Sequence, residues 1–331
     1  MTTVLLAGLG EVGMRCARQL LETPGVEKLL IATRPSERSR EALAVLGSTA
    51  ERISWEPGSD VPKGVDVIAS ALPSEPDLLV ASAAVRAGVP LASAADTSES
   101  AEGYGWLNTR AREAGVTIAI GCGFSPGLSC VLASHAATLF DEPIEIRVAR
   151  CGISGEMSER SVRLELRPLP QMLRDGKWSQ RSRISELVWF PEPIGARDCQ
   201  VVTAMGPQLA EVFPGLERFT WLLAESARKR LSPTALKKRD PDDGWGAIRV
   251  EVFGRTAGAV SSVVYGAVDR TALATGVVLG ATAARLGGLG ASPLSGPGVH
   301  SLAAIVEPIE FLGELAAQGV CAAKFEGALA S

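Results

Sequence analysis

Histidine is scarce in this chain: His135 and His300 are the only two among 331 residues. A metal site built from several imidazoles is therefore excluded. The six cysteines are scattered and contain no Cys-x-x-Cys pair, which is atypical of both zinc sites and disulfide frameworks. Scattered cysteines of this kind are typical of the reduced thiols of an intracellular protein. We therefore expect no bound metal and a cytoplasmic location.

An excess of basic charge is also missing. Lys and Arg number 33 against 37 Asp and Glu, a formal net charge of −4, which gives no reason to expect nucleic acid or an anionic membrane surface. The chain starts directly with an apolar run and lacks the basic segment that opens a secretion signal. Its most apolar long segment, residues 271–289, contains Arg285 and several glycines, so we expect a buried helix rather than a membrane span. These features favour a small-molecule partner.

The chain is 46% apolar and long enough for two domains, each with its own core. The first 35 residues carry its most informative pattern. An apolar run over 3–7 predicts a buried strand, apolar residues four apart from Val12 predict a helix, and residues 28–33 predict a second strand. Between the first strand and the helix the sequence reads Gly8-Leu9-Gly10-Glu11-Val12-Gly13. This order and length are typical of a dinucleotide-binding unit.

Each glycine of this turn has a physical task. Gly8 permits a tight turn, Gly10 lets the backbone approach a pyrophosphate, and Gly13 lets the helix pack close to the strand. The N-terminus of the helix, at Glu11 and Val12, offers unpaired N–H groups and a positive dipole end to the phosphates. The alternative is a structural turn that binds no ligand.

The residues after the second strand favour NADP over NAD. An NAD site usually places Asp or Glu about 20 residues beyond the glycines, to bind the ribose 2′-hydroxyl. Arg34 lies 21 residues after Gly13 in this chain, and its guanidinium fork can bind a 2′-phosphate that a carboxylate would repel. Thr33 and Ser36 can add hydroxyl donors, and Arg38 a second positive charge. The alternative is that these arginines only solvate a loop.

Strands and helices keep alternating to about residue 140, which predicts a doubly wound parallel sheet covered on both faces. The carboxyl ends of such strands face the cofactor. One strand ends in Ala71-Leu72-Pro73, and the strand at 89–92 leads to Asp96. The strand at 116–120 leads to a Gly-rich turn over 121–127. We expect Ala71, Leu72 and Pro73 to contact the cofactor, and the turn residues Ser125, Pro126 and Gly127 to line the substrate pocket.

The pattern changes from about residue 144. Residues 144–151, 161–167, 184–190, 247–253 and 259–268 alternate polar and apolar side chains or favour β-structure, which predicts a mostly antiparallel sheet. We expect helices at 170–175 and 216–230, and a long helix at 269–286 capped by Asp269. We divide the chain into a dinucleotide-binding domain (1–140), an α+β substrate or dimerisation domain (141–268) and C-terminal helices (269–331). The half-apolar sheet favours a homodimer.

Arginine is frequent between residues 147 and 183. The simplest interpretation is a solvated face of the second sheet. The alternative is that one or two of these side chains bind carboxylates of the substrate. The residues are Arg147, Arg150, Arg160, Arg163, Arg167, Arg174, Arg181 and Arg183.

These motifs resemble the saccharopine dehydrogenase (saccharopine reductase) family. The likeness rests on the glycine turn at 8–13, the strand end at 71–73, the turn at 121–127, similar to a Gly-x-x-Pro-Gly turn of that family, and Pro-Gly-Val-His at 297–300. It implies an NADP-binding domain, an α+β domain and a C-terminal segment that returns to the first. It also implies reduction of an imine formed from an amine and an aldehyde, or the reverse oxidation. Leu-Ser-Cys at 128–130, where fungal and plant reductases tend to have Ile-Asp-His, favours an amine or amino-acid substrate other than saccharopine.

Asp96 is our first candidate for a catalytic role, as a proton relay or an anchor for a substrate amine. The alternative is a turn or helix cap, because Asp-Thr-Ser-Glu at 96–99 is good helix-start chemistry. Cys122 is the second candidate, as a contact to the nicotinamide or else as a small buried hydrophobe. We expect His135 to be a core histidine. Tyr104 and Trp106 are either packing residues or aromatic contacts to the nicotinamide.

Three functions therefore stay open. The first is an NADP(H)-dependent oxidoreductase acting on an imine or C–N bond of an amino-acid-like substrate. The second is a dehydrogenase acting on a C–OH or C=O group, as sugar and inositol dehydrogenases do; these often place a lysine before the proline at the pocket strand, where this chain has Leu72. The third is a non-catalytic NADP-sensing protein on the same fold.

Overall fold

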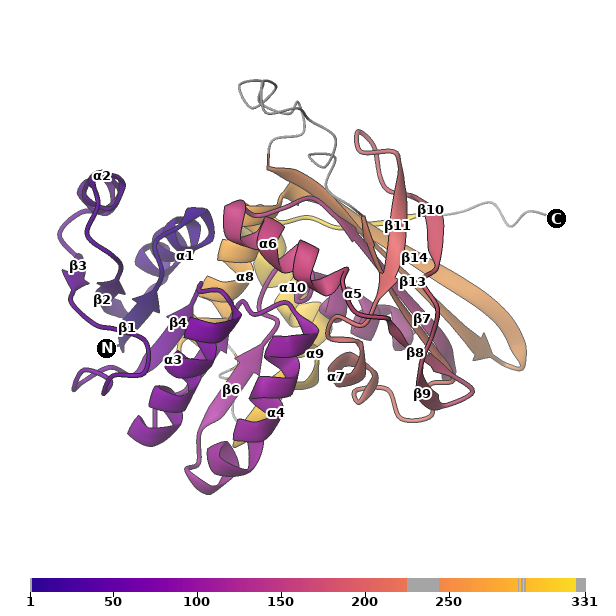
Figure 1. Ribbon diagram of the computed structural model, residues 1–331, viewed down its shortest axis with the longest axis horizontal. Coiled ribbons are helices and arrows are strands. Elements are labelled where there is room, and N and C mark those ends of the chain that lie inside the picture. The colour runs from indigo at the N-terminus through magenta and orange to yellow at the C-terminus, as the bar shows by residue number, and fades with distance from the viewer. Residues whose placement is uncertain (1, 225–243, 291, 293, 295, 326–331) are drawn as a thin grey trace.

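The computed structural model describes residues 2–224, 244–290, 292, 294 and 296–325, which form two β-sheets with helices packed around them (Figure 1). In the first sheet all pairs of strands are parallel, and the order is β15-β6-β5-β4-β1-β2-β3. This confirms the predicted Rossmann-type α/β class. The strands are β1 (Thr2–Ala7), β2 (Val26–Ala32), β3 (Ala50–Ile53), β4 (Val67–Ser70), β5 (Leu91–Ser93), β6 (Thr117–Ile120) and β15 (Gly298–Ser301).

Helices cover both faces of this sheet, which is why its central strands, such as β1 and β4, read as largely apolar runs. In β1, Val4 and Leu6 belong to the core on the side of α1 (Glu11–Glu22) and α8 (Thr271–Leu286). Leu5, between them, belongs to the core on the side of α3 (Ser74–Ala87) and α4 (Ser98–Glu113). All three leucine and valine side chains are fully buried. α2 (Glu37–Leu46) contacts β3 and α1.

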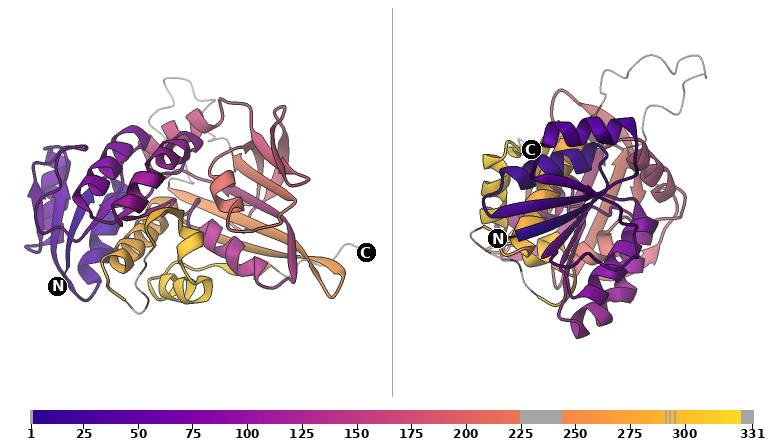
Figure 2. Two further views of the ribbon diagram at one scale, coloured as in Figure 1. Left: turned by 90° about the horizontal axis from the view of Figure 1, so that it is seen from below. Right: turned by 90° about the vertical axis from the view of Figure 1, so that its left-hand side faces the viewer.

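Two glycines allow α8 to pack very closely on α1. A Cβ atom added at Gly276 would lie 2.6 Å from the Cβ of Arg15, and one added at Gly280 would lie 2.9 Å from the Cγ of Gln19. α8 also contacts β4 and β5 of the first sheet and β13 and β14 of the second, and it lies between the two sheets in Figure 2. A helix far along the chain therefore completes the covering of the first sheet. β15, from residues 298–301, joins the same sheet beside β6.

The second sheet is mostly antiparallel, as expected, with one parallel pair between β12 and β7. Its main order is β10-β11-β12-β7-β13-β14-β16, and β8 joins at β12 with β9 beside it. The helix α5 (Leu128–Ala137) packs on β7 and β13. The strands are β7 (Glu142–Cys151), β8 (Gln171–Arg174), β9 (Lys177–Gln180), β10 (Ser185–Trp189), β11 (Ala196–Val202), β12 (Arg218–Ala224), β13 (Trp245–Thr256), β14 (Ala259–Arg270) and β16 (Ala323–Phe325). The remaining helices are α6 (Glu156–Glu165), α7 (Gly206–Ala210), α9 (Leu302–Ile305) and α10 (Pro308–Ala317).

Several expectations for this half of the chain are wrong. The segment expected as a helix over 216–230 contains strand β12, and its residues 225–230 lie outside the described part; the helix expected at 170–175 is strand β8. Every residue of β12 after Arg218 is buried, and a short run of this kind does not distinguish a buried strand from a buried helix. Conversely, the strand expected at 161–167 overlaps α6, where Val162 and the C-cap residue Leu166 are buried with helical spacing.

The long C-terminal helix also starts later than expected. α8 begins at Thr271 with Arg270 at its N-cap, and the carboxylate of Asp269 accepts the N–H of Arg270 at 2.6 Å instead of capping the helix. Among the described helices, none combines the length and apolarity needed to cross a membrane. The cytoplasmic location and the division into three parts stay predictions.

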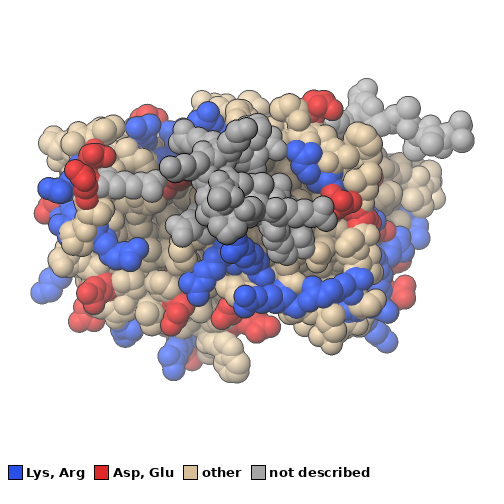
Figure 3. Space-filling view, turned by 45° about the horizontal axis from the view of Figure 1, so that its top comes forward, with Lys and Arg blue, Asp and Glu red and all other residues tan. Residues whose placement is uncertain are grey.

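On the face shown in Figure 3, acidic and basic side chains are interspersed, and basic side chains gather in a band along its lower middle. Most arginines of the second sheet pair with neighbouring carboxylates: Arg218 with Glu145 at 2.7 Å, Arg255 with Glu142 at 2.9 Å, and Arg147 with Glu186. Of the eight arginines between residues 147 and 183, Arg147 agrees with the interpretation of a solvated sheet face, whereas Arg160 and Arg163 lie on helix α6. Leu187 and Trp189 of β10 are exposed, at 58% and 64%. The expected homodimer stays a prediction.

Candidate functional site

A cleft of about 370 Å³ opens at the carboxyl ends of the parallel strands. The strand order of the first sheet reverses between β1 and β4, and ligands bind at this point in doubly wound sheets. The cleft is lined by the ends of β1, β4 and β5, by the turn at 123–126, by β7 and α6 of the second half, and by the start of α8. It therefore lies between the two sheets.

The glycine turn has the geometry that its sequence predicts. Gly8 adopts a φ of 96°, and a Cβ atom at Gly13 would lie 2.0 Å from the carbonyl oxygen of Gly8. These two glycines shape the turn and do not line the cleft. Gly10 does line it, and a Cβ atom there would have no neighbour within 4 Å. Gly10 is also the N-cap of α1, and no side chain caps this end of the helix, which leaves room beside the helix N-terminus suited to a pyrophosphate.

The neighbours of the turn line the same cleft. Glu11 and Val12 lie at the start of α1, and Ala71, Leu72 and Pro73 lie at the end of β4. The carbonyl oxygen of Ala71 would be 3.0 Å from a Cβ atom at Gly8, which shows how closely the two strand ends approach. Apart from the Glu11 carboxylate, this wall presents apolar side chains and backbone groups, as a site for a flat, partly apolar cofactor requires.

Of the four residues expected to bind a 2′-phosphate, Arg34 lines the cleft, and its side chain is exposed. Thr33 and Ser36 are not among the cleft residues. The hydroxyl of Ser36 instead caps α2, where it accepts the N–H of Ser39 at 3.0 Å. The side chain of Arg38 lies outside the described part. Among the described side chains of this set, Arg34 is the one that lines the cleft, and the contacts to a 2′-phosphate stay a prediction.

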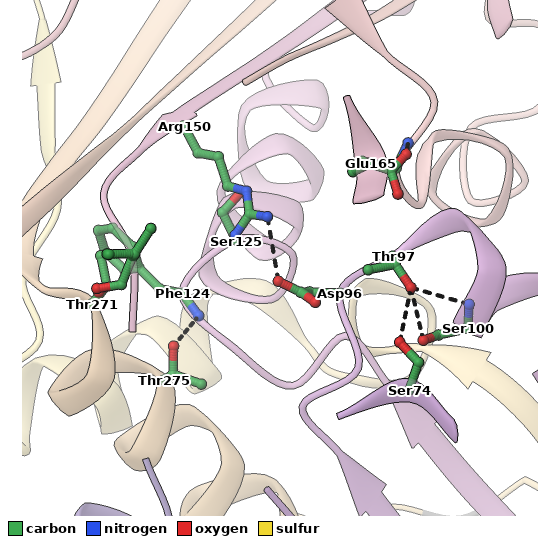
Figure 4. Close-up of polar contacts among 12 residues, drawn as sticks. Ser74, Asp96, Thr97, Ser100, Phe124, Ser125, Arg150, Glu165, Thr271 and Thr275 are labelled. Atoms are coloured by element: carbon green, nitrogen blue, oxygen red, sulfur yellow. Dashed lines mark hydrogen bonds and ion pairs between the residues drawn. The ribbon is translucent and has the colours of Figure 1, made fainter. Parts of the chain in front are cut away.

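Asp96 lies in the cleft and faces Arg150 from the second sheet, whose Nη2 donates to the Asp96 carboxylate at 3.3 Å (Figure 4). Both side chains are largely buried, with 11% of Arg150 and 23% of Asp96 exposed. The N-cap of α4 is Thr97, whose hydroxyl accepts the N–H of Ser100, so Asp96 is not the helix cap. Arg150 is the one arginine of residues 147–183 that lines the cleft. Nothing in the sequence distinguishes it from its neighbours.

Ser125 is buried at the bottom of the cleft, in the turn that precedes α5. The hydroxyl of Ser129 donates to its Oγ at 3.0 Å, which directs the Ser125 proton to another acceptor, such as a ligand in the cleft. Pro126 also lines the cleft. Gly127 shapes the turn without lining it: its φ is 126°, and a Cβ atom would lie 1.9 Å from the carbonyl oxygen of Gly123.

Cys122 does not line the cleft. Its side chain is fully buried, its Sγ donates to the carbonyl of Ala119 at 3.4 Å, and burial raises its pKa to about 12. A neutral, enclosed thiol matches the alternative of a small buried hydrophobe, so we remove Cys122 from the catalytic candidates. The two histidines are also elsewhere. The ring of His135 packs against Tyr265 with centroids 5.4 Å apart, and His300 Nε2 bonds to the carbonyl of Gly296 at 2.8 Å.

A buried carboxylate that the sequence does not reveal lies behind the cleft. Asp77 is fully buried in the first turn of α3 and accepts the hydroxyls of Ser93 at 2.7 Å and of Tyr104 at 2.6 Å. Ser93 in turn accepts the N–H of Ala95, so the group braces the loop that leads to Asp96. Tyr104 is therefore a core residue, and Trp106 is 84% exposed on the surface. The sequence does not single out Asp77, because an acidic residue in the first turn of a helix commonly interacts favourably with the helix dipole.

The stability of the protein should depend on the charge of Asp77. Burial raises the pKa of its carboxyl from 3.8 to about 6. The folded state favours the neutral carboxyl, and the stability that this contributes is fully present below the ordinary pKa of 3.8. It is lost as the pH rises through the folded-state pKa of about 6. Relative to the wild type, Asp77→Asn should therefore gain about 3 kcal/mol of unfolding free energy between about pH 4 and about pH 8. Urea unfolding at both pH values measures this change. The exposed Asp60→Asn should show none, and equal pH profiles for Asp77→Asn and the wild type would contradict the prediction.

No family model matches the chain, and no curated protein matches it in sequence. Solved structures do resemble it. The apo saccharopine dehydrogenase (L-Glu forming) from Saccharomyces cerevisiae aligns with 98% of this chain and 100% of its own, with a TM-score of 0.69 and 14% identity. The C. glutamicum DAP dehydrogenase in complex with DAP aligns over 96% and 99%, with a TM-score of 0.53 and 15% identity.

A third structure is an engineered D-amino acid dehydrogenase bound to NADP+. It aligns with 96% of this chain and 99% of its own, with a TM-score of 0.52 and 15% identity. At such low identity these likenesses concern the fold. The chain therefore has the two-sheet fold of these dehydrogenases over nearly its whole length.

Proposed function

We propose that the protein is an NADP-dependent oxidoreductase that reduces an imine, or oxidises a C–N bond, of an amino-acid-like substrate. The observation that carries the proposal is one cleft that contains both the open N-terminus of α1 at Gly10 and the Arg150–Asp96 pair. The first feature suits a dinucleotide, and the second suits a small zwitterion. The names of the structurally similar dehydrogenases, which act on saccharopine, DAP and D-amino acids, support this choice.

The residues of the first half fit NADP. The N–H groups at the start of α1 would bind the pyrophosphate, Arg34 the 2′-phosphate, and residues 71–73 the nicotinamide side of the cofactor. Bound NADPH supplies a hydride. The protein must then orient the substrate and hold a proton near its nitrogen.

Arg150 and Asp96 suit the two charged groups of an amino acid. Within the described residues the guanidinium of Arg150 has Asp96 as its hydrogen-bond partner, which leaves other N–H groups for a substrate carboxylate. The Asp96 carboxylate can accept a hydrogen bond from a substrate amine or hold the proton that this nitrogen exchanges. The Ser125 hydroxyl, oriented by Ser129, can donate a third hydrogen bond.

Asp96→Asn tests the proton-holding role. It preserves the shape of the side chain and removes its charge, so turnover should fall by at least about tenfold while NADPH affinity stays the same. Steady-state kinetics and a separate titration with NADPH measure the two quantities. Unchanged turnover would remove Asp96 from the mechanism.

The function itself is tested by following NADPH oxidation with aldehydes, ketones and amines, supplied separately and in pairs. Turnover that requires both a carbonyl compound and an amine supports imine reduction. Turnover with a carbonyl compound alone would instead favour a dehydrogenase acting on C=O groups. Tight NADPH binding without turnover would favour a sensor protein, and absence of binding in calorimetry would remove the redox assignment.

A further inference from the structure

Glu165, the last residue of α6, is a buried carboxylate outside the set of cleft residues. It is 3% exposed. Its Oε2 accepts the backbone N–H of Ser98 at 2.9 Å and the hydroxyl of the same residue at 3.1 Å. Its Oε1 accepts the N–H of Ala204 at 2.7 Å. Three donors therefore satisfy one buried carboxylate, as the burial of such a group requires.

These bonds connect two halves of the molecule. Ser98 is the first residue of α4 and belongs to the first sheet's side of the cleft, whereas Glu165 and Ala204 belong to the second half. Glu165 lies beyond the loop that carries Asp96 and Thr97 in Figure 4. A carboxylate that accepts N–H groups at a helix N-terminus makes a strong, charge-assisted contact. Glu165 therefore connects α6 to the start of α4 through hydrogen bonds.

These hydrogen bonds of Glu165 constrain the loop that contains Asp96. Asp96 precedes Ser98 by two residues, and Thr97 between them bonds to Ser74 at 3.1 Å. Arg150 holds Asp96 from the side of the cleft. Two side chains of the second half, Arg150 and Glu165, thus bind a stretch of three residues.

Ala204, which supplies the third donor to Glu165, also has a specific geometry. Ala204 adopts a φ of 42°, a region that residues other than glycine rarely occupy. Its N–H nevertheless points to Glu165. Such a conformation persists where surrounding contacts determine it. The same α6 lines the cleft through Ser158 and Ser161, so one side chain fixes both the cleft wall and the Asp96 loop.

We propose that Glu165 is a positioning residue that holds Asp96 opposite Arg150; this inference rests on the proposed function of that site. Glu165→Ala should lower kcat by about tenfold and change the Kd for NADPH by less than about twofold, because the loop and not the cofactor wall is released. Glu165→Gln keeps one acceptor oxygen and should retain more of the turnover than Glu165→Ala. Glu307→Gln is the matched control: Glu307 accepts the N–H of Glu310 at the start of α10, away from the cleft, and its loss should leave kcat unchanged.

A double-mutant cycle separates positioning from general destabilisation. If Glu165 acts through Asp96, adding Glu165→Ala to Asp96→Asn should lower kcat by less than about twofold further. A multiplicative loss in the double mutant would overturn the proposal, because it would show that Glu165 acts independently of Asp96.

Hydrogen exchange gives a readout that does not require activity. The amides of Ser98 and Ala204 should exchange at least about tenfold faster in Glu165→Ala than in the wild type. Their exchange rates in Glu307→Gln should equal those of the wild type. Unchanged protection in folded Glu165→Ala would overturn the proposal. If the wild type shows no turnover with any substrate, the proposed function fails, and the exchange experiment still decides whether Glu165 holds the loop.

Discussion

Replacing Arg34 by aspartate should weaken NADPH binding by about 100-fold and NADH binding by less than about threefold. Arg34 lines the cleft beyond the carboxyl end of β2, and its exposed guanidinium can pair bidentately with a 2′-phosphate. The substitution removes these bonds and puts a carboxylate in their place, which repels the phosphate. NADH lacks that phosphate and should bind almost as before, or slightly better through its 2′-hydroxyl.

Calorimetric titration with each reduced cofactor measures the two affinities. Arg18→Asp is a suitable control, because Arg18 is an exposed arginine of α1 outside the cleft, and the substitution changes the net charge equally. It should alter both affinities little. An equal loss for NADPH and NADH in Arg34→Asp would remove the assignment of NADP.

Replacing Arg150 by glutamine should lower kcat/KM by at least about 100-fold for a substrate with a carboxylate. The Arg150 side chain is 11% exposed, so its bond to a substrate carboxylate would form in a largely desolvated place. Its removal also deprives Asp96 of its partner at 3.3 Å. For a substrate analogue in which an amide replaces the carboxylate, the same substitution should lower kcat/KM much less.

Arg147 provides a control on the same strand. Successive side chains of a strand point to opposite faces, so Arg147 lies on the other face of β7 from Arg150, where it pairs with Glu186. Arg147→Gln should leave kcat/KM nearly unchanged. If Arg150→Gln impairs the acid and its amide analogue equally, Arg150 does not bind the substrate carboxylate.

The regular features of the fold are readable along the chain. The glycine turn at 8–13 and the alternation of apolar runs with helical stretches predict the parallel sheet, because both signals are local in sequence. The helix predicted from segment 216–224 is wrong because local sequence signals do not include strand pairing. This segment combines apolar and polar residues without a clear period, and its pairing with β7 and β11, which makes it a central strand, comes from distant residues.

The residues of the candidate site also fall into two groups, those that a local motif specifies and those that tertiary contacts bring together. Arg34 and Gly10 occupy positions that the motif itself specifies, and both line the cleft. Arg150 is one of eight similar arginines, and Asp77 and Glu165 are ordinary helix acids in the sequence. Their burial and partners depend on contacts with residues 16 to 67 positions away along the chain. Cys122 shows the converse, because a residue next to the predicted pocket is directed into the core.

The order of residues alone therefore predicts the glycine turn and the two kinds of sheet, and it is the basis of the expected preference for NADP, since each rests on neighbours within about one supersecondary unit. The packing of the two sheets decides which arginine faces Asp96, which carboxylate holds its loop and which thiol is enclosed. The physical reason is that desolvation and hydrogen-bond partners belong to a three-dimensional environment, and short sequence patterns carry no record of residues that approach from elsewhere in the chain.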